Sequence, residues 1–135
     1  MGNYRVLVVD DEAGNVFVMK EVASRNGYEV FTASNGQEGL DVFLDKSPEI
    51  VITDYRMPKM NGLELIERVK KIKRETVVIF TSAVLNNGLR EQAEMLGVFG
   101  CFEKPFEIKT LEDMLNRARR EVELERERDH YYDSC

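Results

Sequence analysis

Short runs of aliphatic residues alternate along this chain with longer segments in which apolar residues recur every three or four positions. The short runs are typical of buried strands, and the longer spacing is typical of amphipathic helices. Each predicted strand is followed by a predicted helix, and this alternation indicates an α/β domain with a parallel sheet. The expected strands cover residues 4–9, 28–33, 49–53, 76–81 and 98–103.

Turn and capping residues set the expected boundaries of the helices. The first helix starts near residue 14 and ends at Gly27. The second ends at Ser47, because the residue before a proline avoids helical backbone angles and Pro48 follows. The other three helices are expected to follow residue 62, to cover about residues 89–96, and to follow residue 105.

The composition of the predicted strands suggests their order in the sheet. The first, third and fourth are nearly continuous Val and Ile, as expected for central strands covered by helices on both faces. The second and fifth contain Glu29, Thr32 and Gly100, which suit sheet edges. We therefore expect a flavodoxin-like fold, a (βα)5 three-layer sandwich with strand order 2-1-3-4-5, whose ligands bind at the carboxyl ends of the strands.

Length, charge and cysteine usage narrow the class of protein. The 135 residues, of which 43% are hydrophobic, suit one domain with its own core. With no apolar run near the roughly 20 residues of a membrane span and no signal-peptide pattern, we expect a cytoplasmic protein without membrane contact. The net charge of −6 opposes direct nucleic-acid contact. Cys101 and Cys135 are expected to be free thiols.

Polar residues follow four of the five predicted strands. A single acid or lysine at such a place usually caps a helix or faces solvent. Here, however, the strand ends together bring three carboxylates, a hydroxyl and an ammonium to one edge of the sheet, which marks a candidate functional site. In strand order these residues are Asp10 and Asp11, Asp54, Thr81 or Ser82, and Lys104.

The chemistry of this set favours a divalent cation and a phosphoryl group. Crowded carboxylates repel one another, which raises their proton affinity unless a cation lies between them. Mg²⁺, or Mn²⁺ in its place, prefers oxygen ligands and needs only one or two direct carboxylates. With the metal on one side and Lys104 on the other, Asp54 can accept a phosphoryl group as a nucleophile.

Four motifs carry a resemblance to a known family. VVDDE, TDYRMPxMNG, TSA and EKPF, in this order and at these intervals, resemble the receiver (CheY-like) domain of bacterial two-component response regulators. The resemblance covers about residues 4–120. We expect residues 1–122 to form the receiver domain and residues 123–135 to form a charged helical extension, linker or tail.

The resemblance implies a role for each site residue. Asp54 would be the phosphoacceptor, and Lys104 would pair with the phosphoryl oxygens. The metal would be bound directly by Asp11, by Asp54 and by the backbone carbonyl of Arg56. Asp10 would be an outer acidic residue, bound to the metal through water.

The resemblance leaves two hydroxyls to choose from, and we choose Ser82. In family members 22 residues usually separate the switch hydroxyl from the lysine, which matches Ser82 and Lys104. The small Ala83 next to it leaves room for a phosphate, whereas strand alternation places Thr81 on the opposite side.

The implied cycle is that of a signalling phosphoacceptor rather than an enzyme, apart from self-phosphorylation from a phosphodonor and self-dephosphorylation. The phosphoryl group would come from a phosphohistidine on a sensor histidine kinase or a phosphotransfer protein. Its charge would re-order the surface of the fourth helix, fifth strand and fifth helix, which would control an output domain or protein. A homodimer through this surface or through the C-terminal helix is a further hypothesis.

Two features depart from the family pattern. Family members commonly carry Tyr or Phe three residues before the lysine, where this chain has Cys101, which we expect to be an inert small hydrophobe. The second departure is the final segment, which is mostly charged, and its His130 is expected to be neither ligand nor phosphodonor.

Arg56 and Val84, near the mouth of the site, are expected to tune the lifetime of the phosphoryl group.

Other functions on a related fold remain open at this point. A flavodoxin-type FMN carrier needs a hydroxyl- and glycine-rich loop where this chain has DDE. A phosphatase of the haloacid dehalogenase type usually carries a second Asp where this chain has Arg56. GxGxxG and GxxxxGK[ST] are both absent from the sequence, which disfavours a nucleotide-binding enzyme. A scaffold that is never phosphorylated is the remaining alternative.

Overall fold

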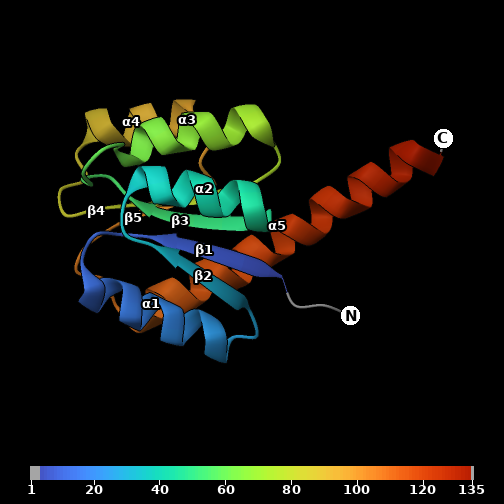
Figure 1. The fold of residues 1–135 in the computed structure, drawn as a ribbon. Coiled ribbons are helices and arrows are strands. Elements are labelled where there is room, and N and C mark those ends of the chain that lie inside the picture. The colour runs from blue at the N-terminus through green and yellow to red at the C-terminus, as the bar shows by residue number, and fades with distance from the viewer. Residues whose placement is uncertain (1–3, 135) are drawn as a thin grey trace.

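The computed structural model describes residues 4–134 and contains one parallel five-stranded sheet in the order β2-β1-β3-β4-β5 (Figure 1). This confirms the predicted flavodoxin-like fold. The elements, in chain order, are β1 (Arg5–Val9), α1 (Ala13–Arg25), β2 (Glu29–Ala33), α2 (Gly36–Lys46), β3 (Ile50–Asp54), α3 (Gly62–Ile72), β4 (Val77–Ser82), α4 (Asn87–Met95), β5 (Gly100–Glu103) and α5 (Ile108–Ser134).

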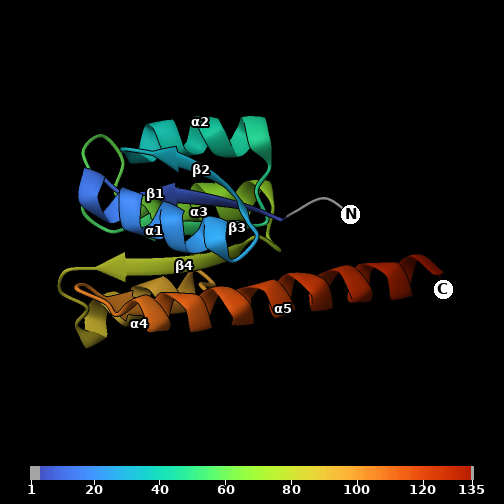
Figure 2. The ribbon, with the colours of Figure 1, turned by 90° about the horizontal axis from the view of Figure 1, so that it is seen from below.

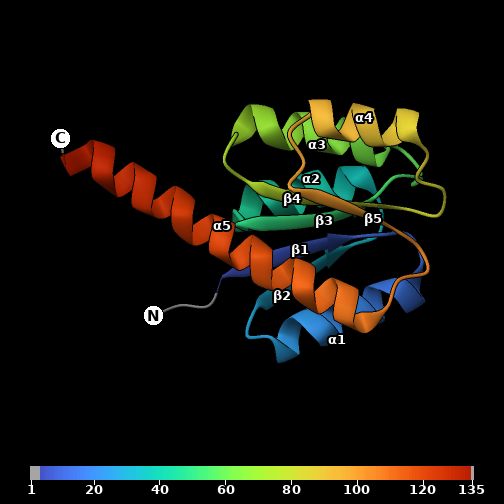
Figure 3. The same cartoon turned by 180° about the vertical axis from the view of Figure 1, so that it is seen from behind.

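Helices cover both faces of the sheet and divide the core into two clusters. Val6 and Val8 of β1 point to the face covered by α1 and α5, whereas Leu7 and Val9 point to the face covered by α2, α3 and α4. Figure 3 shows these two helical layers on opposite faces of the sheet, and Figure 2 looks onto the layer of α1 and α5 from below. The alternation explains why the central strands are almost entirely aliphatic, since both faces of each strand are buried.

Local capping moves two predicted boundaries near the fourth helix. Helix α4 begins at Asn87, earlier than predicted, because the Asn86 side chain accepts a hydrogen bond of 2.8 Å from the Leu89 amide. Strand β5 is shorter than predicted, because residues up to Val98 still belong to the turn that ends α4. In that turn Gly97 has a positive φ of 87°, and the Val98 amide donates to the Ala93 carbonyl.

Helix α5 continues well past the edge of the sheet (Figures 1 and 3). Val122 on α5 is buried in the core, and Arg126 reaches back to Glu49 at 2.8 Å and lies 4.6 Å from the centre of the Tyr4 ring. Contacts with the body of the domain thus extend to residue 126, while the division of the chain at residue 122 stays a prediction. The side chains of residues 129–134, including His130, and all of residue 135 lie outside the described part of the chain.

Across residues 4–134, we find no helix that combines the length and the apolar character needed to cross a membrane.

Candidate functional site

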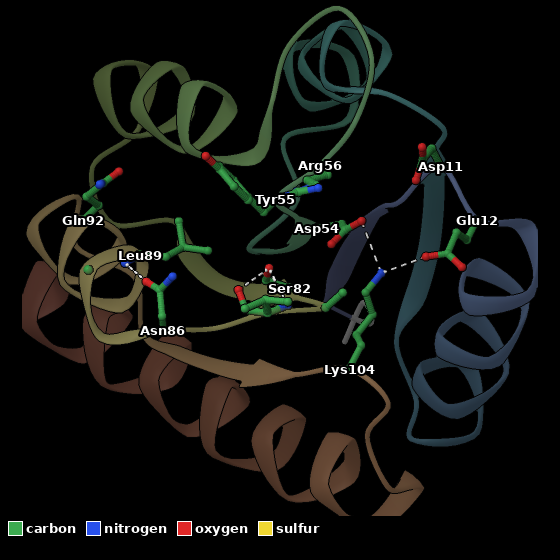
Figure 4. Close-up of a pocket in the computed structure, with 13 residues that line it drawn as sticks. Asp11, Glu12, Asp54, Tyr55, Arg56, Ser82, Asn86, Leu89, Gln92 and Lys104 are labelled. Atoms are coloured by element: carbon green, nitrogen blue, oxygen red, sulfur yellow. Dashed lines mark hydrogen bonds and ion pairs between the residues drawn. The ribbon is translucent and has the colours of Figure 1, made fainter.

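The topology brings the predicted site residues together at the carboxyl ends of the strands. Asp10 follows β1, Asp54 ends β3, Ser82 ends β4 and Lys104 follows β5. All except Asp10 line a cavity of about 720 Å³, together with Asp11. In Figure 4 the side chains of Asp54 and Lys104 point toward each other, with the acidic residues that follow β1 beside them.

Lys104 lies at the centre of the charged groups. Its Nζ is 3.0 Å from Oδ2 of Asp10 and 3.2 Å from Oδ2 of Asp54. The side chains of all three residues are at most 8% exposed, so these ion pairs are largely shielded from water. A third carboxylate, that of the exposed Glu12, lies 3.4 Å from the same ammonium. These three carboxylates hold the ammonium in position.

Burial and neighbouring charges shift the pKa of both central groups. Burial raises the pKa of Asp54, the Asp10 carboxylate raises it further, and Lys104 offsets only part of this. Burial alone would lower the pKa of Lys104, but its hydrogen bonds and ion pairs with Asp10 and Asp54 outweigh that effect, so the pKa is raised. The lysine is therefore firmly charged, while Asp54 has more negative charge around it than one ammonium can balance.

The acidic residues fit a hard divalent cation. Asp10, Asp11, Glu12 and Asp54 each offer a carboxylate oxygen, and these oxygens all lie within 4.8 Å of one another. Oxygen-only donor sets with excess negative charge are those that Mg²⁺ and Mn²⁺ prefer. Of the four, Asp10 has both oxygens engaged, one by the Glu12 amide at 2.9 Å and the other by Lys104. This leaves Asp11, Glu12 and Asp54 better placed for direct ligation.

Glu12 is the residue whose involvement sequence reasoning missed. Its contact with Lys104 and its place in the acidic group were not predicted, although it is the third acid of the DDE run. Arg56, whose carbonyl was the further predicted ligand, lines the cavity beside Tyr55 (Figure 4).

The two candidate hydroxyls have different surroundings. Ser82 lines the cavity, and its Oγ donates to the Val84 carbonyl at 2.9 Å and accepts from the Val84 amide at 3.3 Å. Thr81 is fully buried, is not among the residues that line the cavity, and its Oγ1 has no hydrogen-bond partner among the described residues. The geometry is thus compatible with Ser82 as the hydroxyl that faces the site, and its role stays a prediction.

Comparison with known proteins now decides between the functional classes. The family model described as "Response regulator receiver domain" matches residues 6–116, most of the chain. The chain belongs to the response regulator receiver domain family. This confirms the resemblance drawn from the four motifs. It decides against an FMN carrier and against a phosphatase of the haloacid dehalogenase type.

Relatives of this receiver domain include both single-domain and longer proteins. It is 32% identical to sporulation initiation phosphotransferase F of Bacillus subtilis over 87% of this chain and 94% of that protein. It is 33% identical to the chemotaxis protein CheY of Thermotoga maritima over 84% of this chain and 96% of that protein. With the regulatory protein AtoC of Escherichia coli it shares 29% identity over 95% of this chain, but it spans only 28% of AtoC.

Solved structures show the same arrangement of elements. A response regulator receiver domain protein from Clostridium thermocellum superposes with a TM-score of 0.83 at 32% identity, covering 90% of this chain and 98% of that one. NtrX from Brucella abortus superposes with a TM-score of 0.88 at 28% identity, covering 96% of this receiver domain but 29% of the NtrX chain. Receiver domains thus occur both alone and as parts of larger proteins.

Cys101 occupies the position where receiver domains commonly carry an aromatic ring. It is half-buried against the core cluster under α2, α3 and α4, and Nη1 of Arg90 on α4 donates to its Sγ at 3.1 Å. Burial raises the pKa of the Cys101 thiol, and Arg90 offsets only part of that shift. A thiol that is hard to ionise is a poor nucleophile, which agrees with the expectation of an inert small side chain.

Proposed function

We propose that Asp54 is the phosphoacceptor of this receiver domain and that its phosphoryl donor is a phosphohistidine on a sensor histidine kinase or a phosphotransfer protein. The observation that carries the proposal is the position of Asp54, whose carboxylate borders the cavity and lies 3.2 Å from the Lys104 ammonium. One negative nucleophile thus has a fixed positive charge beside it, with further acidic groups across the site.

The transfer needs little covalent help from the protein. A carboxylate oxygen of Asp54 attacks phosphorus, an O–P bond forms, and the P–N bond to the donor imidazole breaks with its electron pair going to nitrogen. Lys104 is placed to interact with the phosphoryl oxygens that face it. Asp10 keeps the ammonium in position during this exchange, because its ion pair at 3.0 Å does not involve Asp54. Hydrolysis of the acyl phosphate by water returns the carboxylate.

We further propose that Mg²⁺, or Mn²⁺, is held by Asp11, Asp54 and the backbone carbonyl of Arg56, with Asp10 in contact through water. The carboxylate group described above supports this set, and Glu12 joins it as an additional acidic neighbour. The bound ion would neutralise negative charge on the phosphoryl oxygens. Asp11 is exposed and lines the cavity, which leaves it free to take the ion.

Phosphorylation is proposed to draw the Ser82 hydroxyl toward the new phosphoryl oxygens and to re-order the surface formed by α4, β5 and α5. That surface would control an output domain or protein. A homodimer would form through the same surface or through the C-terminal helix. We place the receiver domain at residues 1–122 and a charged extension at residues 123–135. A cytoplasmic location, the absence of direct nucleic-acid contact and the absence of further enzymatic activity also stay predictions.

The test uses a small phosphodonor and the mass of the intact protein. With acetyl phosphate and Mg²⁺, wild type should gain one phosphoryl mass and Asp54→Ala should gain none. Asp45→Ala, which removes an exposed carboxylate on α2, is the matched control and should behave as wild type. Equal gains in wild type and Asp54→Ala would refute Asp54 as the acceptor. No gain in wild type, from acetyl phosphate or from a phosphorylated histidine kinase, would favour the scaffold.

A further inference from the structure

We propose that Glu103 is a positioning residue that restrains the loop between β4 and α4 and so holds the Ser82 hydroxyl away from Asp54 in the unphosphorylated protein. This inference rests on the function proposed above. Glu103 is the last residue of β5, pairs in register with Ser82, and immediately precedes Lys104. Its carboxylate Oε2 accepts a hydrogen bond of 2.9 Å from the Leu85 amide, in the middle of that loop.

The two ends of the loop are fixed to regular structure. At its start the Ser82 carbonyl accepts a hydrogen bond of 2.8 Å from the Lys104 amide, and at its end the Asn86 side chain caps α4. Between these ends, the hydrogen bond from Leu85 to Glu103 ties the loop to β5. A carboxylate that accepts a backbone N–H forms a charge-assisted bond, which is stronger than one between neutral groups.

The Ser82 hydroxyl donates its hydrogen bond within its own loop in this arrangement. Its proton goes to the Val84 carbonyl at 2.9 Å, and no hydrogen bond joins it to Asp54. Figure 4 shows Ser82 and Asp54 on the same cavity. To donate to a phosphoryl oxygen on Asp54, the hydroxyl must release the Val84 carbonyl, which frees residues 83–85 to shift toward the cavity.

The loop has room to make this shift. Ala83 and Val84 line the cavity, and Val84 is 63% exposed, so its movement sacrifices little buried surface. Such a shift would displace the Leu85 amide relative to β5 and stretch its hydrogen bond to Glu103. The Glu103 carboxylate therefore opposes the change that a phosphoryl group on Asp54 favours, and it sets the balance between the two loop positions.

The first test needs no phosphodonor. Hydrogen exchange of the Leu85 amide should be faster in Glu103→Ala than in wild type, and it should be unchanged in Glu107→Ala. Glu107 is the matched control because it is an exposed carboxylate in the turn before α5. Equal exchange of Leu85 in wild type and Glu103→Ala would overturn the proposal at this stage.

The second test measures occupancy of the phosphoryl site with beryllium fluoride and Mg²⁺. Glu103→Ala should lower the half-saturating concentration by about fivefold, the effect of losing one exposed hydrogen bond to a charged group. Glu103→Gln keeps an acceptor and should give a smaller decrease, while Glu107→Ala should match wild type. An unchanged or higher half-saturating concentration in Glu103→Ala would show that the contact does not oppose closure.

The two proposals fail in different ways. If wild type gains a phosphoryl mass but Glu103→Ala shows neither faster exchange nor tighter binding, only the role of Glu103 is refuted. If wild type neither gains the mass nor binds beryllium fluoride, the phosphoacceptor function is refuted, and the inference about Glu103 is overturned with it.

Discussion

Replacing Lys104 by Met tests whether the charged centre of the site is held together as the structure indicates. Lys104 makes buried ion pairs at 3.0 Å with Asp10 and 3.2 Å with Asp54. At an effective dielectric constant of about 20, each pair contributes an attraction of about 5 kcal/mol, and burying the ammonium costs several kcal/mol in return. Removing the lysine leaves two buried carboxylates uncompensated. We expect the free energy of unfolding at pH 7 to fall by about 3 kcal/mol.

The loss should depend on pH in a defined direction. The pKa of Asp54 is already raised by burial and by Asp10, and removal of Lys104 raises it further. A carboxyl group whose pKa is higher in the folded than in the unfolded state destabilises the fold above its unfolded pKa. That penalty disappears as the pH falls through the folded value toward the unfolded one. The difference between Lys104→Met and wild type should therefore shrink in acid.

Urea denaturation with EDTA, at pH 7 and at mildly acidic pH, measures both effects. Lys109→Met is the control, because Lys109 is 80% exposed and its loss should change the free energy of unfolding by less than about 0.5 kcal/mol. Added Mg²⁺ should restore part of the lost stability of Lys104→Met, since a cation can replace the missing positive charge. Equal stability of Lys104→Met and wild type at pH 7 in EDTA would refute the reasoning.

Three further predictions concern the metal, the thiol and the start of α3 beside Asp54. The Mg²⁺ affinity measured by calorimetry should weaken as the pH falls through the raised pKa of Asp54, and pH-independent binding would contradict this. In Asp11→Ala the affinity should fall by at least about tenfold. Iodoacetamide, followed by peptide mapping, should modify Cys101 more slowly in the folded than in the urea-unfolded chain, because its pKa is raised; equal rates would contradict it. Gly62→Ala should destabilise the fold by about 2 kcal/mol or more in thermal denaturation, because the added Cβ would lie 2.1 Å from the Asp54 carbonyl oxygen. In the control Gly14→Ala the added Cβ meets no atom within 4 Å, so this variant should not be destabilised.

The fold could be predicted from the sequence because the buried strands carry a strong signal. Strands covered on both faces are mostly apolar, and β1, β3 and β4 each contain an unbroken run of at least three aliphatic residues. The boundaries around α4 were predicted less well, because they depend on single contacts. The Asn86 cap and the turn at Gly97 act over one or two residues and leave no periodic pattern to detect.

Which residues form the site was also largely predictable, because the carboxyl ends of parallel strands lie on the same side of a sheet. The pairings within the site were not. The sequence places a lysine and several acids at that edge, but it does not say which carboxylate the ammonium contacts. Nor does it show that Glu12, at 67% side-chain exposure, reaches Lys104, or that Glu103 reaches back to the Leu85 amide. Such contacts depend on side-chain rotamers and on loop geometry, which are set only once the whole edge is assembled.

These pairings bear on which part of the molecule moves when Asp54 is modified. Lys104 already touches Asp54, and its second partner, Asp10, is fully buried and also accepts the Glu12 amide. A phosphoryl oxygen added to Asp54 would therefore arrive within reach of an ammonium that has no need to travel. Ser82 is in the opposite situation, since its proton is donated to Val84 within a loop that Glu103 restrains. The structural change that follows phosphorylation should thus begin at the β4–α4 loop, and the lysine should serve as its fixed point.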